Sequence, residues 1–566
     1  MSTAVPAVTP SGQPILILKE GSSQTRGRDA QRNNIMAAKL VSEIVRSSLG
    51  PRGMDKMLLD SLGDVTITND GATMLKEIDV QHPAAKMLVE VAKTTDNEVG
   101  DGTTSAVVLA GALLERAEDL IEQDVHPTVI VDGYKKAAAK ALKSLQSFAQ
   151  KITPGDRQWL IKVAKTSMQS KLISKSSVEL APIAVDAILS VSEKQDGKYK
   201  VDTDNIKVEK KPGGSLKDTK LIKGIVLDKE IVHSGMPKSV NNARVALISS
   251  PLEIEKTEFD AKLNITDPSM MKKFLDEENT LLKGMVDKIH SVNANVLICQ
   301  KGIDDVAQHY LAKAGILAVR RAKESDLTKL AKATGARVVT SLDELTRKDL
   351  GSCKIVEERK VDDDKWVFVE GCKNPKAVTI LIRGGQQRVV DEADRSLHDS
   401  LMVTKDVLEK PAIVAGGGAS EVEAAQHVLK WAEKLSGREQ LAAQKFVEAL
   451  ESLAVTLASN AGLDPIDAKV QLRAKHAENG KWFGVDANEG KISDMYKQEV
   501  FEPLAVKEHI IKAATEATSM ILRVDDVIAS GKSKAPPMPP GGGMPGMGGM
   551  GGMGGMPGMG GMPDMD

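Results

Sequence analysis

The chain has 566 residues and a mass of 60.5 kDa, which is more than one hydrophobic core usually serves, so about two to four domains are expected. Its 76 Lys and Arg residues nearly balance its 78 Asp and Glu residues, and no basic block marks a nucleic-acid surface. No window approaches the roughly 18 to 20 apolar residues that a membrane helix needs, and the N-terminus lacks the pattern of an export signal. These features favour a cytoplasmic protein with neither nucleic acid nor membrane as partner.

The cysteines and histidines form no recognisable metal or disulfide motif. Cys299, Cys353 and Cys372 are isolated in sequence, with no CxxC pair, which argues against a disulfide framework or a zinc site. The histidines are scattered, with no HExxH. This usage fits a reducing cytoplasm, and any metal is expected to be a hard ion bound by oxygen atoms.

The first segment of the chain alternates short strands with amphipathic helices. Residues 15–18 read as an apolar strand, and a helix is expected at 29–48, where Gly50-Pro51 ends it because Pro cannot continue the hydrogen-bond ladder. Further helices are predicted at 83–98, 105–123 and 128–149. Five apolar residues are expected on one face of the first helix: Ile35, Met36, Leu40, Ile44 and Val45.

The middle of the chain, from Gly224, changes to short β-rich runs separated by helical or polar stretches. This rhythm predicts a separate α/β domain. Between 253 and 283 the strand pattern is interrupted by apolar residues among many charges, which indicates an excursion from that domain. The predicted strands lie at 225–227, 245–248, 296–298, 317–319 and 338–339.

Long helical patterns return after residue 385. They cover 395–408, 421–435 and 438–461, and the last is closed by Gly462 as a C-cap. This block is similar in style to the first. The middle is therefore predicted to be inserted into a discontinuous outer domain, which gives three spatial domains in a multidomain α/β protein.

Both ends of the chain have the composition of disordered segments. Residues 1–13 are a short extension rich in Pro, Ser, Thr and Ala. From Ala535 the chain is a GGM-like repeat of Pro, Gly and Met that cannot bury enough apolar surface to fold. This tail is either an inert linker or a segment that touches apolar clients through its Met side chains.

Three turns are candidates for ligand binding. Residues 48–51 (SLGP) follow a helix and form either a phosphate loop or an ordinary helix stop, since glycine lets the backbone approach a phosphate. Residues 69–71 (NDG) end a strand at 64–68 and form either a hairpin turn with a structural Asp or a site for a catalytic carboxylate. Residues 415–419 (AGGGA) join a strand to a helix and either hold a ligand against the backbone or pack tightly; no Walker P-loop is present.

Residues 100–105 (GDGTTS) give the clearest site signal, because they open a helix whose free N–H groups and positive end attract phosphate. Asp101 would repel phosphate unless a cation lay between them, so its natural role is to hold Mg²⁺. A simple N-cap is the alternative. Asp399 has no such local signal, since it lies in an acid-rich helical stretch with Asp391 and Asp394 that reads as a solvated face.

Together and in this order, these segments resemble the group II chaperonins, and among them the archaeal thermosomes most closely. The likeness runs from about Pro14 to Lys532. It rests on LGPRGMDKM at 49–57, ITNDGAT at 67–73, GDGTT at 100–104, RSLHD at 395–399, GGGA at 416–419 and GKISDM at 490–495.

The resemblance implies the chaperonin fold, with a mostly helical equatorial ATPase domain, a small α/β intermediate domain, and an α/β apical domain that carries a helical protrusion. It also implies an ATP-dependent chaperone that binds unfolded proteins and encloses them in a homo- or hetero-oligomeric double ring under a built-in lid. The implied segments are a flexible extension (1–13), equatorial (14–150 and 409–532), intermediate (151–222 and 372–408), apical (223–371, with the lid protrusion at about 253–283) and a disordered tail (533–566).

Site residues follow from the matching motifs. Asp70 and Asp399 are expected to position and activate the attacking water, and Asp101 to bind Mg²⁺, with K⁺ as a further cofactor beside ATP and ADP. Lys171, in the segment 166–171 (TSMQSK), resembles the family's γ-phosphate-sensing loop. Asp494 is expected on the nucleoside side with Gly417 and Asp486. The full nucleotide-binding set is Ser48, Leu49, Gly50, Pro51, Asn69, Gly71, Gly102, Thr103, Thr104, Ser105, Lys171, Gly416, Gly417, Gly418, Asp486 and Asp494.

The implied mechanism is a cycle in which ATP binding and hydrolysis rotate the intermediate domain, bring Asp399 toward the nucleotide, and close the lid. Two other hypotheses use the same phosphate loops. A small-molecule kinase would need an acceptor pocket, and the middle domain supplies no recognisable one. A scaffold would use nucleotide only to stabilise its assembly.

Overall fold

The computed structural model describes residues 7–8, 14–15, 23–59, 63–171, 173–254, 268–373 and 375–529. These residues divide between two compact units, one of which is Gly27–Asp525. In the other unit, two antiparallel strand pairs join β1 (Ala7–Val8) to β2 (Pro14–Ile15) and β3 (Ser23–Arg26) to β23 (Asp526–Ala529). Most of the predicted 1–13 extension, and all of the predicted 533–566 tail, lie outside the described residues.

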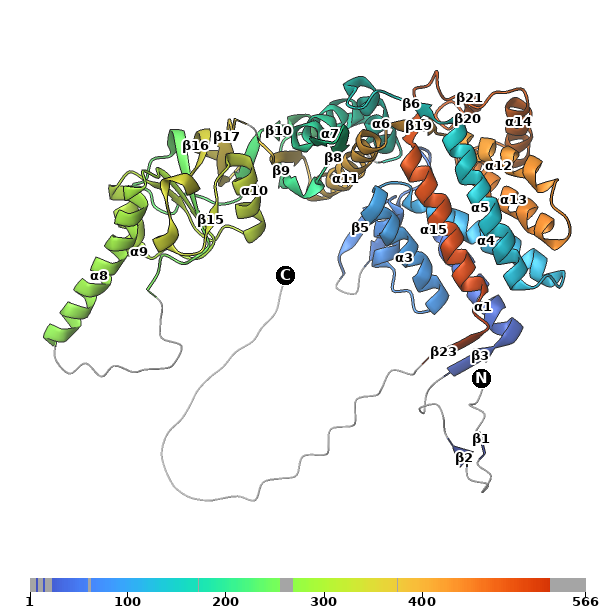
Figure 1. The fold of residues 1–566 in the computed structure, drawn as a ribbon, viewed down its shortest axis with the longest axis horizontal. Coiled ribbons are helices and arrows are strands. Elements are labelled where there is room, and N and C mark those ends of the chain that lie inside the picture. The colour runs from blue at the N-terminus through green and yellow to red at the C-terminus, as the bar shows by residue number, and fades with distance from the viewer. Residues whose placement is uncertain are drawn as a thin grey trace, which may run out of the picture. The chain divides into compact units, whose positions relative to one another are not determined.

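In the larger unit, helices from the two ends of the sequence pack into one block. α4 contacts α13 and α15, and α5 contacts α12, α13 and α15, so the blue and red helices of Figure 1 lie side by side. A Tyr134–Phe446 ring pair, with centroids 5.8 Å apart, joins α5 to α13 inside this core. The helices are α1 (Gly27–Arg46), α3 (Pro83–Val99), α4 (Thr103–Glu122), α5 (Pro127–Phe148), α12 (Ala419–Ala432), α13 (Arg438–Asn460), α14 (Pro465–Ala477) and α15 (Leu504–Leu522).

The prediction of which face α1 buries is partly wrong. Ile35 and Val45 are buried, but Met36, Leu40 and Ile44 are 54%, 62% and 41% exposed. α1 packs closely on α4, where a Cβ added to Gly111 would come within 2.3 Å of Ser42. Such a close approach needs small side chains, so the buried face is completed by Ala30, Asn34, Ala38, Val41 and Ser42.

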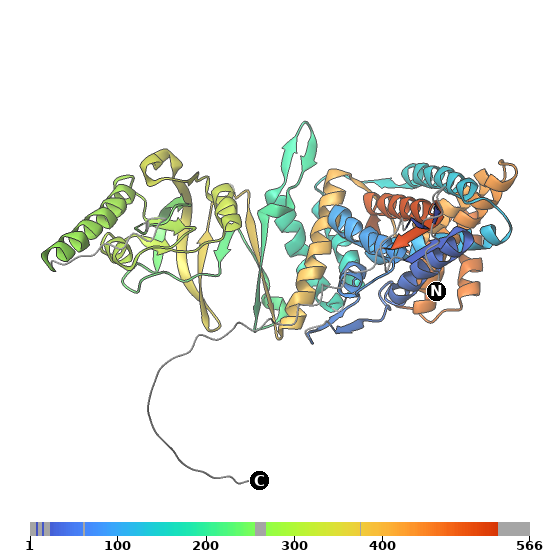
Figure 2. The same ribbon diagram turned by 90° about the horizontal axis from the view of Figure 1, so that it is seen from below.

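A second group of elements combines three helices with a three-stranded sheet. β18 lies in the centre of this sheet, parallel to β9 and antiparallel to β10. α11 packs against α6 and α7, as the long orange helix beside the teal helices in Figure 2 shows. The elements are α6 (Arg157–Gln169), α7 (Ser177–Val191), β7 (Glu193–Gln195), β8 (Lys198–Lys200), β9 (Ile206–Pro212), β10 (Lys220–Ile222), β18 (Val378–Gly384) and α11 (Gln387–Glu409).

The middle of the chain forms a seven-stranded mixed sheet, and all five predicted strands of this region are confirmed. Its order is β11-β17-β16-β12-β13-β14, and β15 also pairs with β12. Of the predicted excursion at 253–283, residues 255–267 lie outside the described residues, and α8 begins at Pro268. The elements are β11 (Gly224–Leu227), β12 (Ser239–Ile248), α8 (Pro268–Ser291), β13 (Val296–Cys299), α9 (Asp305–Lys313), β14 (Leu317–Val319), α10 (Glu324–Thr334), β15 (Val338–Val339), β16 (Gly351–Val361) and β17 (Asp364–Glu370).

Short strands and one short helix connect the helical block and carry the turns singled out in the sequence. β4 pairs with β5, β19 lies between β6 and β22, and β20 pairs with β21. Among the described helices, none is both long and apolar enough to cross a membrane. The elements are β4 (Lys56–Leu59), β5 (Val65–Thr68), α2 (Gly71–Glu77), β6 (Gln150–Lys151), β19 (Ala412–Ala415), β20 (Phe483–Asp486), β21 (Lys491–Asp494) and β22 (Phe501–Pro503).

Candidate functional site

A cavity of about 330 Å³ lies at the start of α4, between turns that come from both ends of the sequence. Its volume is within the range of small-molecule sites in proteins. The structure therefore brings together segments that are more than 300 residues apart. The sequence-predicted residues that line the cavity are Leu49, Gly50, Pro51, Asp101, Gly102, Ser105, Gly417, Gly418 and Asp486.

The start of α4 faces this cavity with free backbone donors. Gly100 ends α3 and Gly102 begins α4, and both have left-handed backbone angles, with φ of 68° and 79°. Asp101 lies between them and accepts a hydrogen bond only 2.6 Å long from the N–H of Gly102. The N-cap position belongs to Gly102, so the reading of Asp101 as a simple N-cap is wrong, and its carboxylate lines the cavity.

The turn after α1 is folded tightly against itself. Ser48 donates its hydroxyl proton to the Val45 carbonyl at 2.6 Å and is buried below the turn rather than in the cavity. A Cβ on Gly53 would lie 2.2 Å from the Ser48 carbonyl oxygen, so only glycine fits there. This packing presents Leu49, Gly50 and Pro51 to the cavity.

The glycine turn between β19 and α12 forms the opposite wall. Gly417 and Gly418 have φ of 64° and 78°, and a Cβ on Gly417 would lie 2.8 Å from the Val485 carbonyl oxygen. The N–H of Val485 donates to the Gly417 carbonyl at 2.8 Å, so the turn is held backbone to backbone against β20. The predicted strand-turn-helix context is confirmed.

Beside the cavity, a buried ion cluster joins three elements. Lys171 Nζ lies 2.9 Å from Asp399 Oδ2 and 3.8 Å from Asp70 Oδ1, and all three side chains are less than 10% exposed. The Thr103 hydroxyl donates to Asp70 Oδ1 at 3.1 Å. Because Thr103 is in the first turn of α4, the cluster is connected to the cavity wall.

Asp70 is held by α2 rather than by a hairpin. It is the N-cap of that helix, and its Oδ2 accepts a hydrogen bond from Thr73 N at 2.7 Å. A Cβ on Gly71 would lie 2.7 Å from the Thr104 hydroxyl, so the turn approaches α4 closely. Asn69 donates its side-chain amide to the Ser170 carbonyl, which links this turn to the end of α6. The hairpin interpretation of residues 69–71 is therefore wrong.

The pattern-based interpretation of Asp399 as part of a solvated face is also wrong. Its side chain is 6% exposed, whereas Asp391 and Asp394 on the same helix are 32% exposed and pair with Lys210. α11 packs against α6 on the side that carries Asp399, and this contact brings the carboxylate to Lys171. Helical periodicity alone does not report such a buried ionic contact.

The charges in this cluster separate the pKa values of its two carboxyl groups. Burial raises the pKa of Asp399 well above its usual range, and the negative charges of Asp70 and Asp101 add to this effect, against the attraction of Lys171. Burial also acts to raise the pKa of Asp70, but Lys171 and hydrogen bonds from Thr73 and Thr103 outweigh it and leave that pKa below its usual range. Asp399 is thus the better proton acceptor of the pair.

Sequence reasoning missed a second buried ion cluster, which lines the cavity itself. Lys507 Nζ lies 2.6 Å from Glu421 Oε1 and 2.5 Å from Glu502 Oε2. Burial raises the pKa of Glu502 to about 6, and the charges of Glu421 and Asp101 act in the same direction against Lys507. No clear signal in the sequence marks this cluster, because Lys507 is followed by the polar residues Glu508 and His509.

The end of α6 supplies further lining residues from segment 166–171, which was predicted as a loop near the γ-phosphate: Thr166, Ser167, Gln169 and Ser170. Among predicted residues, Gly416 packs against Glu502, since a Cβ there would lie 2.7 Å from Glu502 Oε1. Asp494 lies elsewhere. It lines a separate shallow pocket with Trp482, and its Oδ1 accepts a hydrogen bond from Tyr496 N at 3.0 Å.

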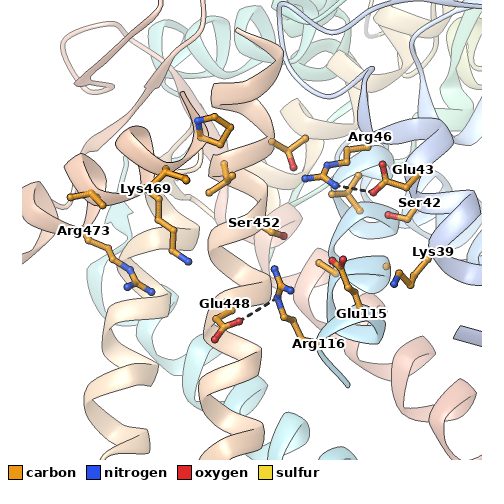
Figure 3. Close-up of a pocket in the computed structure, with 18 residues that line it drawn as sticks. Lys39, Ser42, Glu43, Arg46, Glu115, Arg116, Glu448, Ser452, Lys469 and Arg473 are labelled. Carbon is orange, nitrogen blue, oxygen red and sulfur yellow. Dashed lines mark hydrogen bonds and ion pairs between the residues drawn. The ribbon is translucent and has the colours of Figure 1, made fainter. Parts of the chain in front are cut away.

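A second cavity, of about 350 Å³, lies between α1, α4, α13 and α14 (Figure 3). Two of its arginines are paired within the molecule: Arg46 with Glu43 at 2.8 Å, and Arg116 with Glu448 at 3.3 Å. Among the described residues that line it, none was predicted to bind a ligand, and it lacks the glycine turns of the first cavity. The first cavity is therefore the candidate site.

The donor atoms of the first cavity fit a metal ion that takes some of its ligands from the protein and others from a bound phosphate. Within the described ranges, no group of three or more His, Cys, Asp or Glu residues is arranged to hold a metal alone. Asp101 offers one carboxylate at the start of a helix, which is the type of site where Mg²⁺ keeps substrate oxygens and waters as its other ligands.

Comparison with known proteins shows which family the chain belongs to. The TCP-1/cpn60 chaperonin family matches residues 41–532. The chain is 57% identical to thermosome subunit alpha of Archaeoglobus fulgidus, over 94% of this chain and 98% of that protein. It is 56% identical to the thermosome subunit of Pyrococcus horikoshii, over 92% and 95% of the two chains, and 56% identical to thermosome subunit beta of Sulfurisphaera tokodaii, over 94% and 96%. The chain belongs to the TCP-1/cpn60 chaperonin family, as an ATP-hydrolysing, protein-folding chaperone of the thermosome type.

Proposed function

We propose that the cavity at the start of α4 is the ATP site of this chaperone. The free N–H groups of α4 and the turn at 49–51 receive the phosphates, and Gly417 and Asp486 lie on the nucleoside side. Asp101 would hold Mg²⁺, which would neutralise phosphate charge, and K⁺ would be a further cofactor. The residues of the chain itself orient the nucleotide and the attacking water.

Asp70 and Asp399 position the attacking water, and Asp399 takes its proton. The observation that carries this assignment is Lys171 Nζ, which lies 2.9 Å from Asp399 and 3.8 Å from Asp70 beside the first turn of α4. Lys171 also places a positive charge where phosphate charge develops. The low pKa of Asp70 keeps that carboxylate ionised, while the raised pKa of Asp399 suits a proton acceptor.

The three groups of elements would then serve as the three domains of the family. The helical block is the equatorial ATPase domain, the three-stranded sheet with α6, α7 and α11 is the intermediate domain, and the seven-stranded sheet is the apical domain. α8 would belong to the lid protrusion. Because α11 carries Asp399 from the intermediate domain to the site, rotation of that domain would control hydrolysis.

We further propose that the chain assembles with identical or related subunits into a double ring in the cytoplasm and encloses unfolded proteins. The relatives it resembles are named as thermosome subunits, some alpha and some beta, which supports an oligomer of one or two chain types. The proposed closure of the lid would follow the same movement of α11.

The test is Asp399→Ala. We expect ATP hydrolysis to fall by about 100-fold or more, because general-base assistance is typically worth 10² to 10⁴, while ATP binding measured by calorimetry and particle size stay unchanged. Asp394→Ala is the matched control, since Asp394 lies on the same helix but pairs with Lys210 at the surface. Hydrolysis at the unaltered rate in Asp399→Ala would contradict the assigned role.

A further inference from the structure

Two cysteines that are separate in sequence lie next to each other at one end of the β16–β17 pair. The two strands are antiparallel, and Ile355 pairs with Glu370. One step further, the N–H of Lys354 donates to the Gly371 carbonyl at 3.2 Å. Beyond this hydrogen bond, the next residue on each of the two segments is Cys353 and Cys372, respectively.

Both cysteine side chains enter the same hydrophobic core. Cys353 is 6% exposed and Cys372 is 8% exposed, and they belong to one cluster of buried residues. Lys354 and Gly371, the pair beside them, are both exposed, which places the two thiols on the opposite, core side. Neighbouring strands lie about 4.8 Å apart, which suits the separation of about 4.4 to 6.8 Å between the Cα atoms of a disulfide.

The backbone keeps the segments that contain Cys353 and Cys372 close together. Gly371 has a φ of 74°, and a Cβ added there would lie 2.5 Å from Lys354 Cβ. A left-handed glycine at a strand end is typical of a bulge, in which the chain bends without leaving its partner. Cys372 therefore stays beside Cys353 although regular pairing ends at Glu370.

We propose that Cys353 and Cys372 are a redox-sensitive pair that closes to an intramolecular disulfide when the protein meets hydrogen peroxide. One thiolate attacks the peroxide oxygen and becomes a sulfenic acid, with release of water. The second thiolate attacks that sulfur, forms the S–S bond and releases a second water. The two thiols lose two electrons and two protons, and the peroxide is reduced.

The environment of the pair sets the speed of this reaction. Burial raises the pKa of Cys372 to about 11, and burial with the nearby charge of Cys372 raises the pKa of Cys353 to about 12. Both groups are therefore protonated at neutral pH, and Cys372 is the first to form a thiolate. Oxidation should be slow at pH 7 and should accelerate as the pH rises.

The third cysteine provides an internal comparison. Cys299 is also buried, and its Sγ donates to the Ser250 carbonyl at 3.2 Å. It lies on β13, which β12 separates from β16 in the sheet. At about 4.8 Å per strand, this spacing is too large for a disulfide to Cys353.

A disulfide here would close a loop around the whole β16–β17 hairpin. Cys372 also begins the segment that leaves the seven-stranded sheet and leads to β18 in the three-stranded sheet. The bond would tie this connection to the start of β16 and restrict movement between the two sheets. Its effect would be reversed by a thiol reductant.

The experiment is oxidation of the assembled protein by hydrogen peroxide at pH 8.5, alkylation of remaining thiols, and digestion without reductant. We expect a linked peptide that contains Cys353 and Cys372 by mass spectrometry and that disappears after dithiothreitol. Cys299→Ser should retain this peptide, whereas Cys353→Ser and Cys372→Ser should each lose it while keeping the unaltered circular dichroism spectrum.

Three results would overturn the proposal. Cys353 and Cys372 could remain fully alkylated after the treatment, the linked peptide could contain Cys299, or non-reducing electrophoresis could show that the bond joins two chains. The test does not involve nucleotide, so its outcome is independent of the ATP-site assignment.

Discussion

Lys171 is the residue on which the charge balance of the candidate site depends. It is 7% exposed and is the cation that faces both Asp70 and Asp399. Burial opposes its positive charge, but the two carboxylates outweigh this effect and raise its pKa, so it remains protonated. Without it, two carboxylates would face each other in a buried site, and one of them would take up a proton.

We therefore expect Lys171→Met to reduce ATP hydrolysis by about 100-fold, as for loss of a preorganised charge in other active sites. The remaining activity should also show a changed pH dependence. Lys171 lowers the pKa of Asp399, so its removal raises that pKa further, and hydrolysis should be lost at a higher pH as the solution is acidified. A pH–rate profile of the variant measures both effects.

Lys175→Met is the control for this substitution, because Lys175 lies in the same segment but is exposed. It should hydrolyse ATP at the unaltered rate and with the unaltered pH profile. If Lys171→Met lowered activity without moving the acidic limb, its role would be structural, and the proposed charge coupling to Asp399 would be wrong.

At the scale of elements, α11 carries another buried carboxyl group near its C-terminal end. Asp406 is 8% exposed, and its Oδ2 has no hydrogen-bond partner among the described residues. Burial raises its pKa to about 7; Glu409 and Asp101 act in the same direction, and Lys405 and Lys410 oppose them. As the pH rises, the unfolded chain therefore loses the Asp406 proton near pH 3.8, whereas the folded protein keeps it until about pH 7.

The sign of the pH effect follows from this difference. Between pH 3.8 and about pH 7 the folded state holds more protons at Asp406 than the unfolded state, so this residue lowers the free energy of unfolding as the pH rises. Asp406→Asn removes the titration. This substitution should increase the free energy of unfolding, measured by urea denaturation. The increase should be larger at pH 8.5 than at pH 5.5 by about 2 kcal/mol.

Asp391→Asn is the matched control on the same helix, because Asp391 is 32% exposed and pairs with Lys210 at 3.0 Å. It should show no comparable gain at alkaline pH. A gain in Asp406→Asn that did not change with pH would mean that relief of packing, rather than loss of a buried charge, explains the effect.

At the scale of the whole larger unit, a buried lysine connects the three-stranded sheet to the seven-stranded sheet. Lys207 on β9 lies 2.7 Å from Asp326 on α10 and donates to the Val226 carbonyl on β11 at 2.8 Å. The Lys207 and Asp326 side chains are 9% and 10% exposed. Removing one member of a buried pair leaves the other charge without compensation, at a cost of about 3 to 5 kcal/mol.

We expect Lys207→Met to loosen this junction and to speed cleavage by a protease in segment 371–377, which connects β17 of the seven-stranded sheet to β18 of the three-stranded sheet. Lys207→Met combined with Asp326→Leu should recover part of the resistance, since it removes one of the two carboxylates, Asp326 and Glu209, that pair with Lys207. Lys360→Met is the control, because Lys360 is 70% exposed and its ion pair with Asp363 is at the surface. Equal cleavage rates in Lys207→Met and the unaltered protein would contradict this connecting role.

The sequence by itself determined the family, the fold class, several long helices and five strands of the middle sheet. The motifs at 49–57, 100–104 and 395–399 indicate a group II chaperonin, and family membership with the mixed α/β structure confirms this. Periodicity predicted α3, α4 and α5 to within a few residues, because hydrophobic spacing and end signals are local. Asp101 could be singled out for the same reason, since its glycine neighbours and the helix behind it are adjacent in sequence.

Tertiary structure alone decided which charges are buried together. Asp399 on α11 pairs with Lys171, which follows α6, and Lys507 on α15 pairs with Glu421 on α12. The exposed face of α1 was also misread, because close packing on α4 rather than hydrophobic spacing selects its buried residues. Burial and ion pairing depend on contacts between residues far apart in the chain, and a local sequence pattern does not show which distant residues will meet.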